Sequence, residues 1–192
     1  MKKELDKELY PDCVYPEFTP DPNEPFREPI AKLGKKITDR IPQKLGLKKI
    51  TRNDPEYWGL AGVLTDEEAE LAVKLGVRKP KTLAEIVKLS GLEEKKCEAL
   101  LEEMSRKGLL EYNWENPKHE KQYVLPMYVP GCAEFFNMNA NILDSNPEMG
   151  TFFEHMSRLP LEKITPFVPE AVPVSVCMLS RWKKRSRWKM NP

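Results

Sequence analysis

Hydrophobic positions in the centre of the chain recur with helical spacing, and each helical stretch starts at a capping box. In such a box a Ser or Thr and the Glu three residues later each bond the other's backbone N–H. The pattern occurs three times, at Thr65/Glu68, Thr82/Glu85 and Ser90/Glu93. It predicts helices over residues 65–75, 82–89 and 90–107, with Gly76 and Gly108 ending the first and the third. The third helix carries one apolar stripe turned to a core, formed by Cys97, Leu100, Leu101 and Met104.

After Gly108 the pattern changes from helical to alternating. One alternating run contains Leu110 and Tyr112, and a second contains Tyr123, Leu125 and Met127. The polar stretch 113–121 separates them, which predicts a β-hairpin with a long tip. Helix, short turn, longer helix and hairpin follow one another in the order of a winged helix-turn-helix. The sequence therefore predicts a winged-helix core at 65–128, in a chain that is mainly α with a small β-hairpin.

The N-terminal flank is rich in proline. Residues 1–30 hold six of the 18 prolines, with Tyr10, Tyr15, Phe18 and Phe26 interleaved among them. Because proline fixes φ and lacks an N–H, neither a helix nor a central strand is expected here. Two interpretations stay open, an extended segment whose aromatic side chains fill grooves on another surface and a disordered tail.

Further helices are expected on both sides of the core. Residues 31–45 predict a short basic helix around Lys32, Lys35 and Lys36. Residues 56–63 predict a helix that buries Tyr57, Trp58 and Leu60, with Asp54 as its cap and Pro55 in its first turn. Beyond Pro130 an apolar face combines Phe135, Phe136, Ile142 and Leu143, and Pro147 starts a helix that carries Phe152, Phe153 and Met156.

These patterns divide the chain into four parts. They are an extended Pro-rich segment (1–30), a winged-helix domain with its preceding helices (31–130, core 65–128), a helical extension (131–169) and a tail (170–192).

Charge decides between the two common uses of a winged helix. The chain has 31 basic and 30 acidic residues, a net charge of +1. Residues 93–107 hold five acids against four bases, although DNA affinity depends on Lys and Arg that neutralise phosphates. The charges therefore favour protein docking over DNA binding. Trp114 at the hairpin tip is the candidate contact, because Trp is a frequent interface anchor. The alternative, that Trp114 folds back on its own hairpin, stays open.

The residues offer no catalytic, cofactor-binding or metal site. Cys13, Cys97, Cys132 and Cys177 are too far apart for a CxxC pair, which favours isolated reduced thiols. His119 lies in a polar loop and His155 on an expected amphipathic helix, so both fit surface or boundary histidines better than catalytic bases. No phosphate-binding glycine motif is present. The chain has neither a spanning segment nor a secretory signal, so a cytoplasmic location and no membrane partner are expected.

Four stretches together resemble a known family. They are YPEFTPDPNEPFREPIAKLGKKI, NDPEYWGLAGVLTDEEAELAVKLGVRKPKTL, GLLEYNWENPKHEKQYVLPMYVPG and LPLEKITPFVP. Across residues 10–169 the chain resembles the N-terminal region of bacterial iron–sulfur flavoproteins, oxidoreductases mostly of anaerobes. The resemblance implies a 4Fe–4S cluster, FAD and NAD(P) in the full-length parent. The residues that bind them follow this region in the family, so none is carried over to a position here.

After Pro169 the chain departs from that family. It reads EAVPVSVCMLSRWKKRSRWKMNP, where the family continues with a Gly-rich turn and a string like GMHVIPVEKAIEM. In a shifted reading frame, the third base of each codon is read with the first two bases of the next. With suitable synonymous codons, residues 170–192 then read GGGAGIGMHVIPVEKAIEMENEP. Residues 170–192 are therefore interpreted as a frameshifted, disordered tail. Without the frameshift, the Lys and Arg residues of this segment, together with Trp182 and Trp188, would indicate a surface that binds nucleic acid or a membrane.

The function expected from the sequence is a non-catalytic docking or scaffold region of an iron–sulfur flavin oxidoreductase, present here as a truncated fragment. Its expected partners are the cluster and flavin domains, or an oxidoreductase subunit, and not nucleic acid. The alternative is a winged-helix transcriptional regulator that binds DNA.

Overall fold

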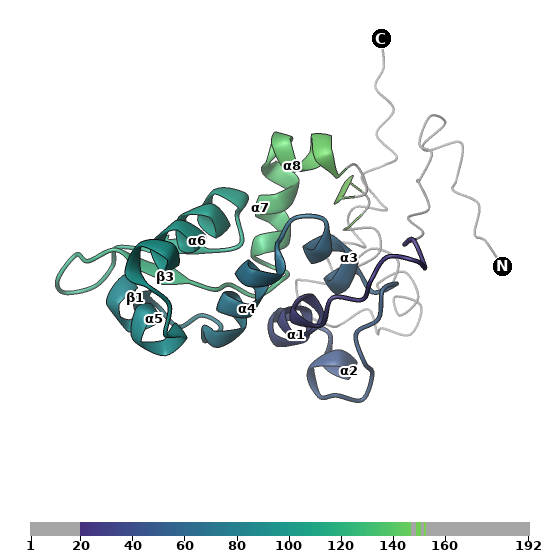
Figure 1. Ribbon diagram of the computed structural model, residues 1–192, viewed down its shortest axis with the longest axis horizontal. Coiled ribbons are helices and arrows are strands. Elements are labelled where there is room, and N and C mark those ends of the chain that lie inside the picture. Colours follow the sequence, from purple (N-terminus) through teal and green to yellow (C-terminus); the bar gives the residue numbers. More distant parts are fainter. Residues whose placement is uncertain (1–19, 147–148, 151, 153–192) are drawn as a thin grey trace, which may run out of the picture. The chain divides into compact units, whose positions relative to one another are not determined.

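Eight helices and three short strands lie in the part of the chain that the computed structural model describes, residues 20–146, 149–150 and 152 (Figure 1). The helices are α1 (Glu28–Ile37), α2 (Ile41–Lys44), α3 (Pro55–Ala61), α4 (Asp66–Lys74), α5 (Leu83–Ser90), α6 (Glu94–Lys107), α7 (Cys132–Met138) and α8 (Ala140–Ser145). The strands are β1 (Lys81–Thr82), β2 (Glu111–Asn113) and β3 (Gln122–Val124). The fold is mainly helical with a small antiparallel sheet, as the sequence predicts.

Helix α1 starts earlier than the sequence predicts. It begins at Glu28, so the expectation that no helix forms before residue 31 is wrong for the last three residues of the Pro-rich segment. Pro29 occupies the first turn, where a backbone N–H would make no hydrogen bond within the helix, so its absence costs nothing. The apolar face of α1 is fully buried through Ile30, Leu33 and Ile37, and α1 packs against α3 and α4.

Helix α3 begins where the sequence places it, but its cap differs. Pro55 lies in the first turn, and Tyr57, Trp58 and Leu60 are buried as predicted. Asp54 occupies the N-cap position without a side-chain cap hydrogen bond, so its predicted capping role is wrong. Its carboxylate instead accepts hydrogen bonds from Thr51 and Arg40, which lie before the helix.

Two of the three predicted capping boxes form. Thr65 with Glu68 caps α4, and Thr82 with Glu85 caps α5, each with both reciprocal bonds. The third box, at Ser90, is wrong. Ser90 is the last residue of α5, Gly91 ends that helix in the left-handed conformation (φ 73°), and α6 starts only at Glu94. Helix α6 ends at Gly108, as predicted.

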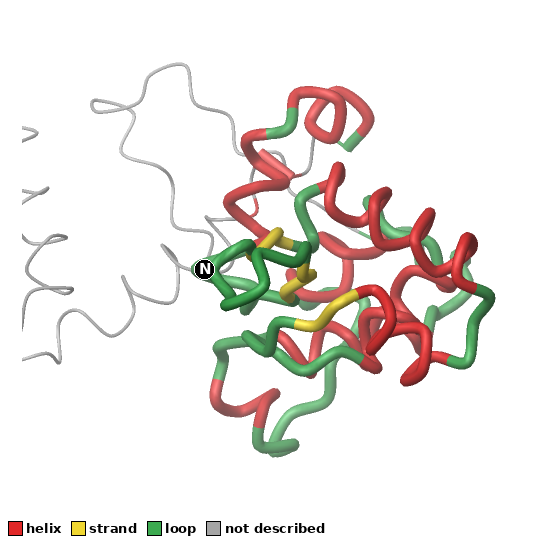
Figure 2. Tube along the Cα trace, turned by 90° about the vertical axis from the view of Figure 1, so that its left-hand side faces the viewer, coloured by secondary structure: helices red, strands yellow, loops and turns green. Residues whose placement is uncertain are grey.

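The sheet contains one strand more than the predicted hairpin. Strands β2 and β3 pair antiparallel with Tyr112 opposite Tyr123, which confirms the hairpin. Strand β1, which the sequence analysis misses, pairs with β3 through Lys81 opposite Tyr123, so the strand order is β1-β3-β2. The strands are short and the long loop 114–121 joins two of them (Figure 2).

After the sheet the chain returns to helix, as predicted, in α7 and α8. Phe136 and Ile142 are buried and Leu143 is half-buried, but the prediction for Phe135 is wrong because its side chain is 41% exposed. Phe152 is buried and packs against Trp58 and Tyr128. Of the predicted helix at Pro147, only Met149, Gly150 and Phe152 are described, and Phe153, Met156 and the tail 170–192 lie outside the described residues.

None of the helices in the described ranges has both the length and the apolar character that crossing a bilayer requires.

Candidate docking surface on helix α6 and the hairpin

Helices α5 and α6 are joined by a three-residue turn, residues 91–93. Gly91 takes the positive φ that this turn requires, and the backbone N–H of Gly91 closes on the Val87 carbonyl. Ile86 on α5 and Cys97, Leu101 and Met104 on α6 are buried, whereas Leu100 is half-buried. The predicted apolar stripe of α6 therefore faces the core, and the opposite face, with Glu94, Lys95 and Glu98, is exposed.

One carboxylate on α6 fastens the hairpin to this helix. Glu102 accepts hydrogen bonds from the Tyr123 hydroxyl (2.5 Å), the Lys121 ammonium (2.5 Å) and the Tyr112 hydroxyl (2.9 Å). The Lys121 nitrogen also lies 4.3 Å from the centre of the Tyr112 ring, a cation–π contact. Glu102 thus bonds both strands of the hairpin and fixes its position on α6.

The pKa values of this cluster reflect its hydrogen bonds. Burial alone would raise the pKa of Glu102, but the bonds from Lys121, Tyr123 and Tyr112 outweigh it and hold this pKa below its usual value. Burial would lower the pKa of Lys121, and the Glu102 carboxylate raises it instead. Burial and the bond to Glu102 both raise the pKa of Tyr123. All three groups therefore stay in the protonation states that keep the hairpin attached at neutral pH.

The hairpin tip is ordered by its own side chains and presents Trp114 outward. The Asn116 amide donates to the Glu120 carbonyl (2.7 Å), and its oxygen accepts from the Glu120 N–H (3.0 Å). The Asn113 amide donates to Gln122 across the base of the loop (2.7 Å). Trp114 is 53% exposed. About half of this large aromatic side chain faces solvent and the rest is covered, so docking through Trp114 and folding back on its own hairpin both stay predictions.

Most of the basic side chains on this surface are engaged by carboxylates. Lys96 pairs with Glu67 on α4, Arg106 with Glu103 (2.9 Å), Lys118 with Glu120 (3.8 Å) and Lys121 with Glu102. Lys107 pairs with Glu68 at 2.7 Å, and Glu68 is only 2% exposed. The surface therefore lacks the cluster of free cations that a phosphate backbone would need.

The other residues considered for chemistry do not gather into a site. His119 is exposed in the hairpin loop, where its φ of 52° fits a tight turn. Cys97 and Cys132 are buried free thiols, and burial raises the pKa of both. Across the described residues, no three His, Cys, Asp or Glu side chains are arranged to hold a metal ion. Cys13, Cys177 and His155 lie outside the described residues.

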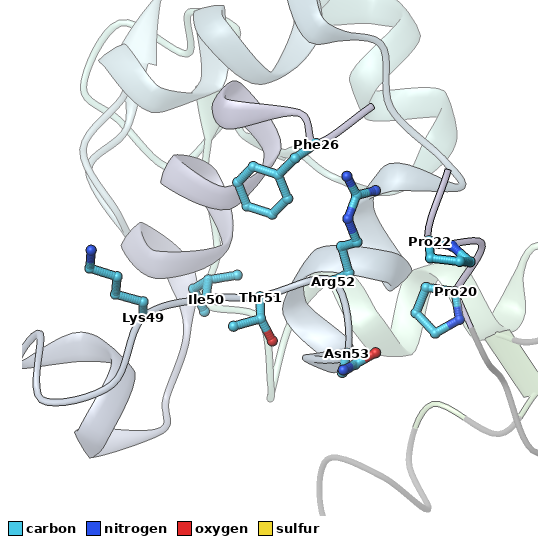
Figure 3. A pocket seen from close by; sticks show the side chains of 8 residues that line it. All are labelled: Pro20, Pro22, Phe26, Lys49, Ile50, Thr51, Arg52 and Asn53. Atoms are coloured by element: carbon cyan, nitrogen blue, oxygen red, sulfur yellow. The ribbon is translucent and has the colours of Figure 1, made fainter. Parts of the chain in front are cut away.

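A shallow hollow of about 480 Å³ lies on another part of the surface, between the start of α1 and the segment 49–53 (Figure 3). Phe26 stacks on Tyr57 (ring centroids 4.8 Å apart), and the Arg52 guanidinium covers the Phe26 ring at 5.6 Å. Phe26 and Arg52 are among the side chains that line it. Phe26 thus packs on the chain's own Tyr57. Tyr10, Tyr15 and Phe18 lie outside the described residues.

Sequence reasoning misses the buried ion-pair network beneath α1 and α3. Arg40 binds both Glu56, whose side chain is fully buried, and Asp54 (3.0 Å). The Thr38 hydroxyl donates to Glu56 (2.7 Å). The sequence signal for this network is Glu56, which lies between Pro55 and Tyr57 in a helix expected to be buried. A buried carboxylate requires a partner, so its position indicates an ion pair.

Comparison of the chain with protein-family models, with curated proteins and with solved structures finds no match.

Proposed function

We propose that residues 65–128 form a winged helix that works as a protein-docking element of an iron–sulfur flavin oxidoreductase. The winged-helix part of the proposal is supported by element order. A first helix (α4), a short strand (β1), two helices joined by a tight turn (α5, α6) and a hairpin (β2, β3) follow one another, and β1 joins the sheet beside β3. This order is that of a helix-turn-helix extended by a wing.

The docking part is supported by one observation above all, the ordered and solvent-facing Trp114. An interface anchor gains most when it needs little ordering on binding. The bonds of Asn113 and Asn116, and the attachment of the hairpin through Glu102, fix the tip in advance. DNA binding remains the alternative function, and the engagement of the basic side chains by carboxylates weighs against it.

The oxidoreductase part is supported by the four sequence stretches alone. They place this region next to a ferredoxin-type cluster domain and FAD and NAD(P) domains in the resembled family. The proposed partner is accordingly such a cluster or flavin domain, or a subunit that carries one, and the cofactors belong to the partner. A cytoplasmic setting fits this proposal.

The test is to titrate the chain separately with a ferredoxin-type 4Fe–4S domain and a flavin domain from an oxidoreductase of the resembled family. Binding should weaken at least 30-fold in Trp114→Ala, because an interface Trp costs about 2 kcal/mol or more on truncation. Met138→Ala, which removes an exposed apolar side chain of α7 outside the hairpin, is the comparison variant and should weaken binding less. A DNA duplex library is titrated in parallel at about 0.15 M salt. Submicromolar, sequence-selective DNA binding would overturn the proposal in favour of a regulator.

A further inference from the structure

The loop 41–49, which begins with helix α2, exposes three aliphatic side chains together. Ile41 is 67% exposed, Leu45 69% and Leu47 78%. Ile41 and Leu45 are four residues apart and share one face of the helical turn, and Leu47 follows directly after Gly46. Single exposed apolar residues are ordinary, but three in one short loop are not. Nothing in the packing of the described residues accounts for them.

This loop is held in one conformation. The Lys48 N–H donates to the Pro42 carbonyl (2.9 Å), and the Leu45 N–H donates to that of Ile41 (2.9 Å). Gly46 adopts φ 76°, which a side chain would strain, and Gln43 points inward and is only 2% exposed. At its base Arg40 is bound to the buried Glu56. The aliphatic side chains are therefore displayed by a fixed loop.

Exposed lysines lie in the same loop as the three aliphatic residues. Lys44, Lys48 and Lys49 are exposed within the loop itself, and the exposed Lys35 reaches it, since its ammonium lies 3.5 Å from where a Gly46 side chain would begin. From residue 28 to residue 56 there are eight bases against four acids, a net charge of +4 in a chain whose total is +1. Asp39 is the exposed acid beside the loop, and Asp54, which contacts Lys48 at 3.3 Å, is buried.

We propose that the loop 41–49 attaches the protein to an anionic lipid surface, with Ile41, Leu45 and Leu47 entering the headgroup–acyl boundary and the lysines contacting acidic headgroups. A projecting turn with aliphatic ends needs no matching pocket in a bilayer. Protein interfaces are typically anchored by aromatic residues or Arg, which this turn lacks. Lys is a strongly hydrated point charge, which suits long-range attraction to acidic lipid headgroups better than a specific protein contact. The proposal departs from the expectation of no membrane partner, which rests on the lack of a spanning segment, because contact with a membrane surface needs no such segment. It is independent of the function proposed for α6 and the hairpin.

The test is cosedimentation of the full chain with vesicles of phosphatidylcholine alone and with about 30% phosphatidylserine. Residues 181–189 hold six Lys or Arg residues and two Trp, which could bind anionic lipid themselves. All variants are therefore made in the 192-residue chain with those six basic residues changed to Ser. This parent should bind the anionic vesicles, bind neutral ones at least tenfold more weakly, and dissociate in about 0.5 M NaCl.

Two loop variants and two matched controls separate this loop from general stickiness. Lys44→Ser with Lys49→Ser should weaken binding about 30-fold, which is about 1 kcal/mol for each lysine near an anionic surface. Leu45→Asn with Leu47→Asn should weaken it at least tenfold. The controls are Lys88→Ser with Lys95→Ser and Leu89→Asn with Met138→Asn, all exposed residues elsewhere, and they should bind like the parent. Circular dichroism melting checks that every variant is folded.

The proposal is overturned if the parent does not bind anionic vesicles, if neutral vesicles bind as well, or if the control variants lose as much as the loop variants. An absence of vesicle binding would point instead to an acidic protein surface as the occupant.

Discussion

Replacing Glu102 by Ala tests whether one carboxylate holds the hairpin on α6. The substitution removes the acceptor of Tyr112, Lys121 and Tyr123 together. The bond from Tyr123 contributes most, because Tyr123 is 2% exposed and a hydrogen bond to a charged group is worth about 1.5–3 kcal/mol. The Lys121 ion pair adds at most about 1 kcal/mol, because both side chains are about a third exposed and solvent screens them. The expected loss in the free energy of unfolding is about 2–3 kcal/mol.

The measurement is urea unfolding followed by circular dichroism at pH 7, with Glu98→Ala as the control. Glu98 lies one turn earlier on the same helix and is exposed, so its loss should cost less than about 0.5 kcal/mol. Tyr123→Phe completes a double-mutant cycle with Glu102→Ala. A coupling near zero would show that the Glu102–Tyr123 bond contributes nothing, and an equal loss in Glu98→Ala would refute the whole argument.

The same variant has a defined pH dependence. The folded-state pKa of Glu102 is lowered from its ordinary value of 4.5, so its stabilisation is fully present above that value. It is lost as the pH falls through the lower, folded-state pKa. The difference in unfolding free energy between the native chain and Glu102→Ala should therefore shrink between pH 6 and pH 3. A difference that stays constant over this range would contradict a charged acceptor at residue 102.

Two further changes test other parts of the fold by the same unfolding measurement. Asp54→Asn should cost about 2 kcal/mol at pH 7, because Arg40 loses one of its two carboxylates. Bonds from Thr51 and Arg40 lower the Asp54 pKa despite burial, so this stability is fully present above pH 3.8 and is lost as the pH falls through the lower, folded-state pKa. An unchanged cost at pH 3 would count against this assignment. Gly91→Ala should cost about 1–2 kcal/mol, because the backbone φ of 73° strains a side chain although no atom lies near it. Gly108→Ala should cost clearly more, because its Cβ would also lie 2.6 Å from that of Phe135. Equal costs at the two glycines would contradict the packing of Phe135 over Gly108.

Features set by neighbours in the sequence are predictable, and features set by distant residues are not. The boxes at Thr65 and Thr82 form as predicted because a capping box involves only four consecutive residues. Asp54 is a typical N-cap residue by local rules, but its carboxylate accepts from Thr51 and from Arg40, which is 14 residues away. Ser90 fails because the helix before it continues to that residue and Gly91 then supplies the turn.

The candidate surface shows the same division. Alternation places the hairpin correctly, because the side-chain period of a strand is visible in the sequence. Strand β1 has two residues, too few for any period, and exists only through its pairing with β3 some 40 positions later. The role of Glu102 is hidden for the same reason, since its partners lie 10 to 21 residues away and its helical neighbours are also acidic.

Hydrogen bonds and ion pairs also change what the charge of α6 means for a partner. By sequence, residues 93–107 hold five acids and four bases, a net charge of −1. Two of the acids, Glu102 and Glu103, and three of the bases, Lys96, Arg106 and Lys107, are paired within the protein. Glu93, Glu94 and Glu98 then face solvent against Lys95, which leaves −2 on the face that a winged helix would turn to DNA. Because affinity for a phosphate backbone rises with the number of phosphates that the protein neutralises, a net charge of this sign would disfavour DNA more than the sequence total suggests. A protein partner that carries bases opposite Glu94 and Glu98 would gain from the same charges, and its approach would be fastest at low salt.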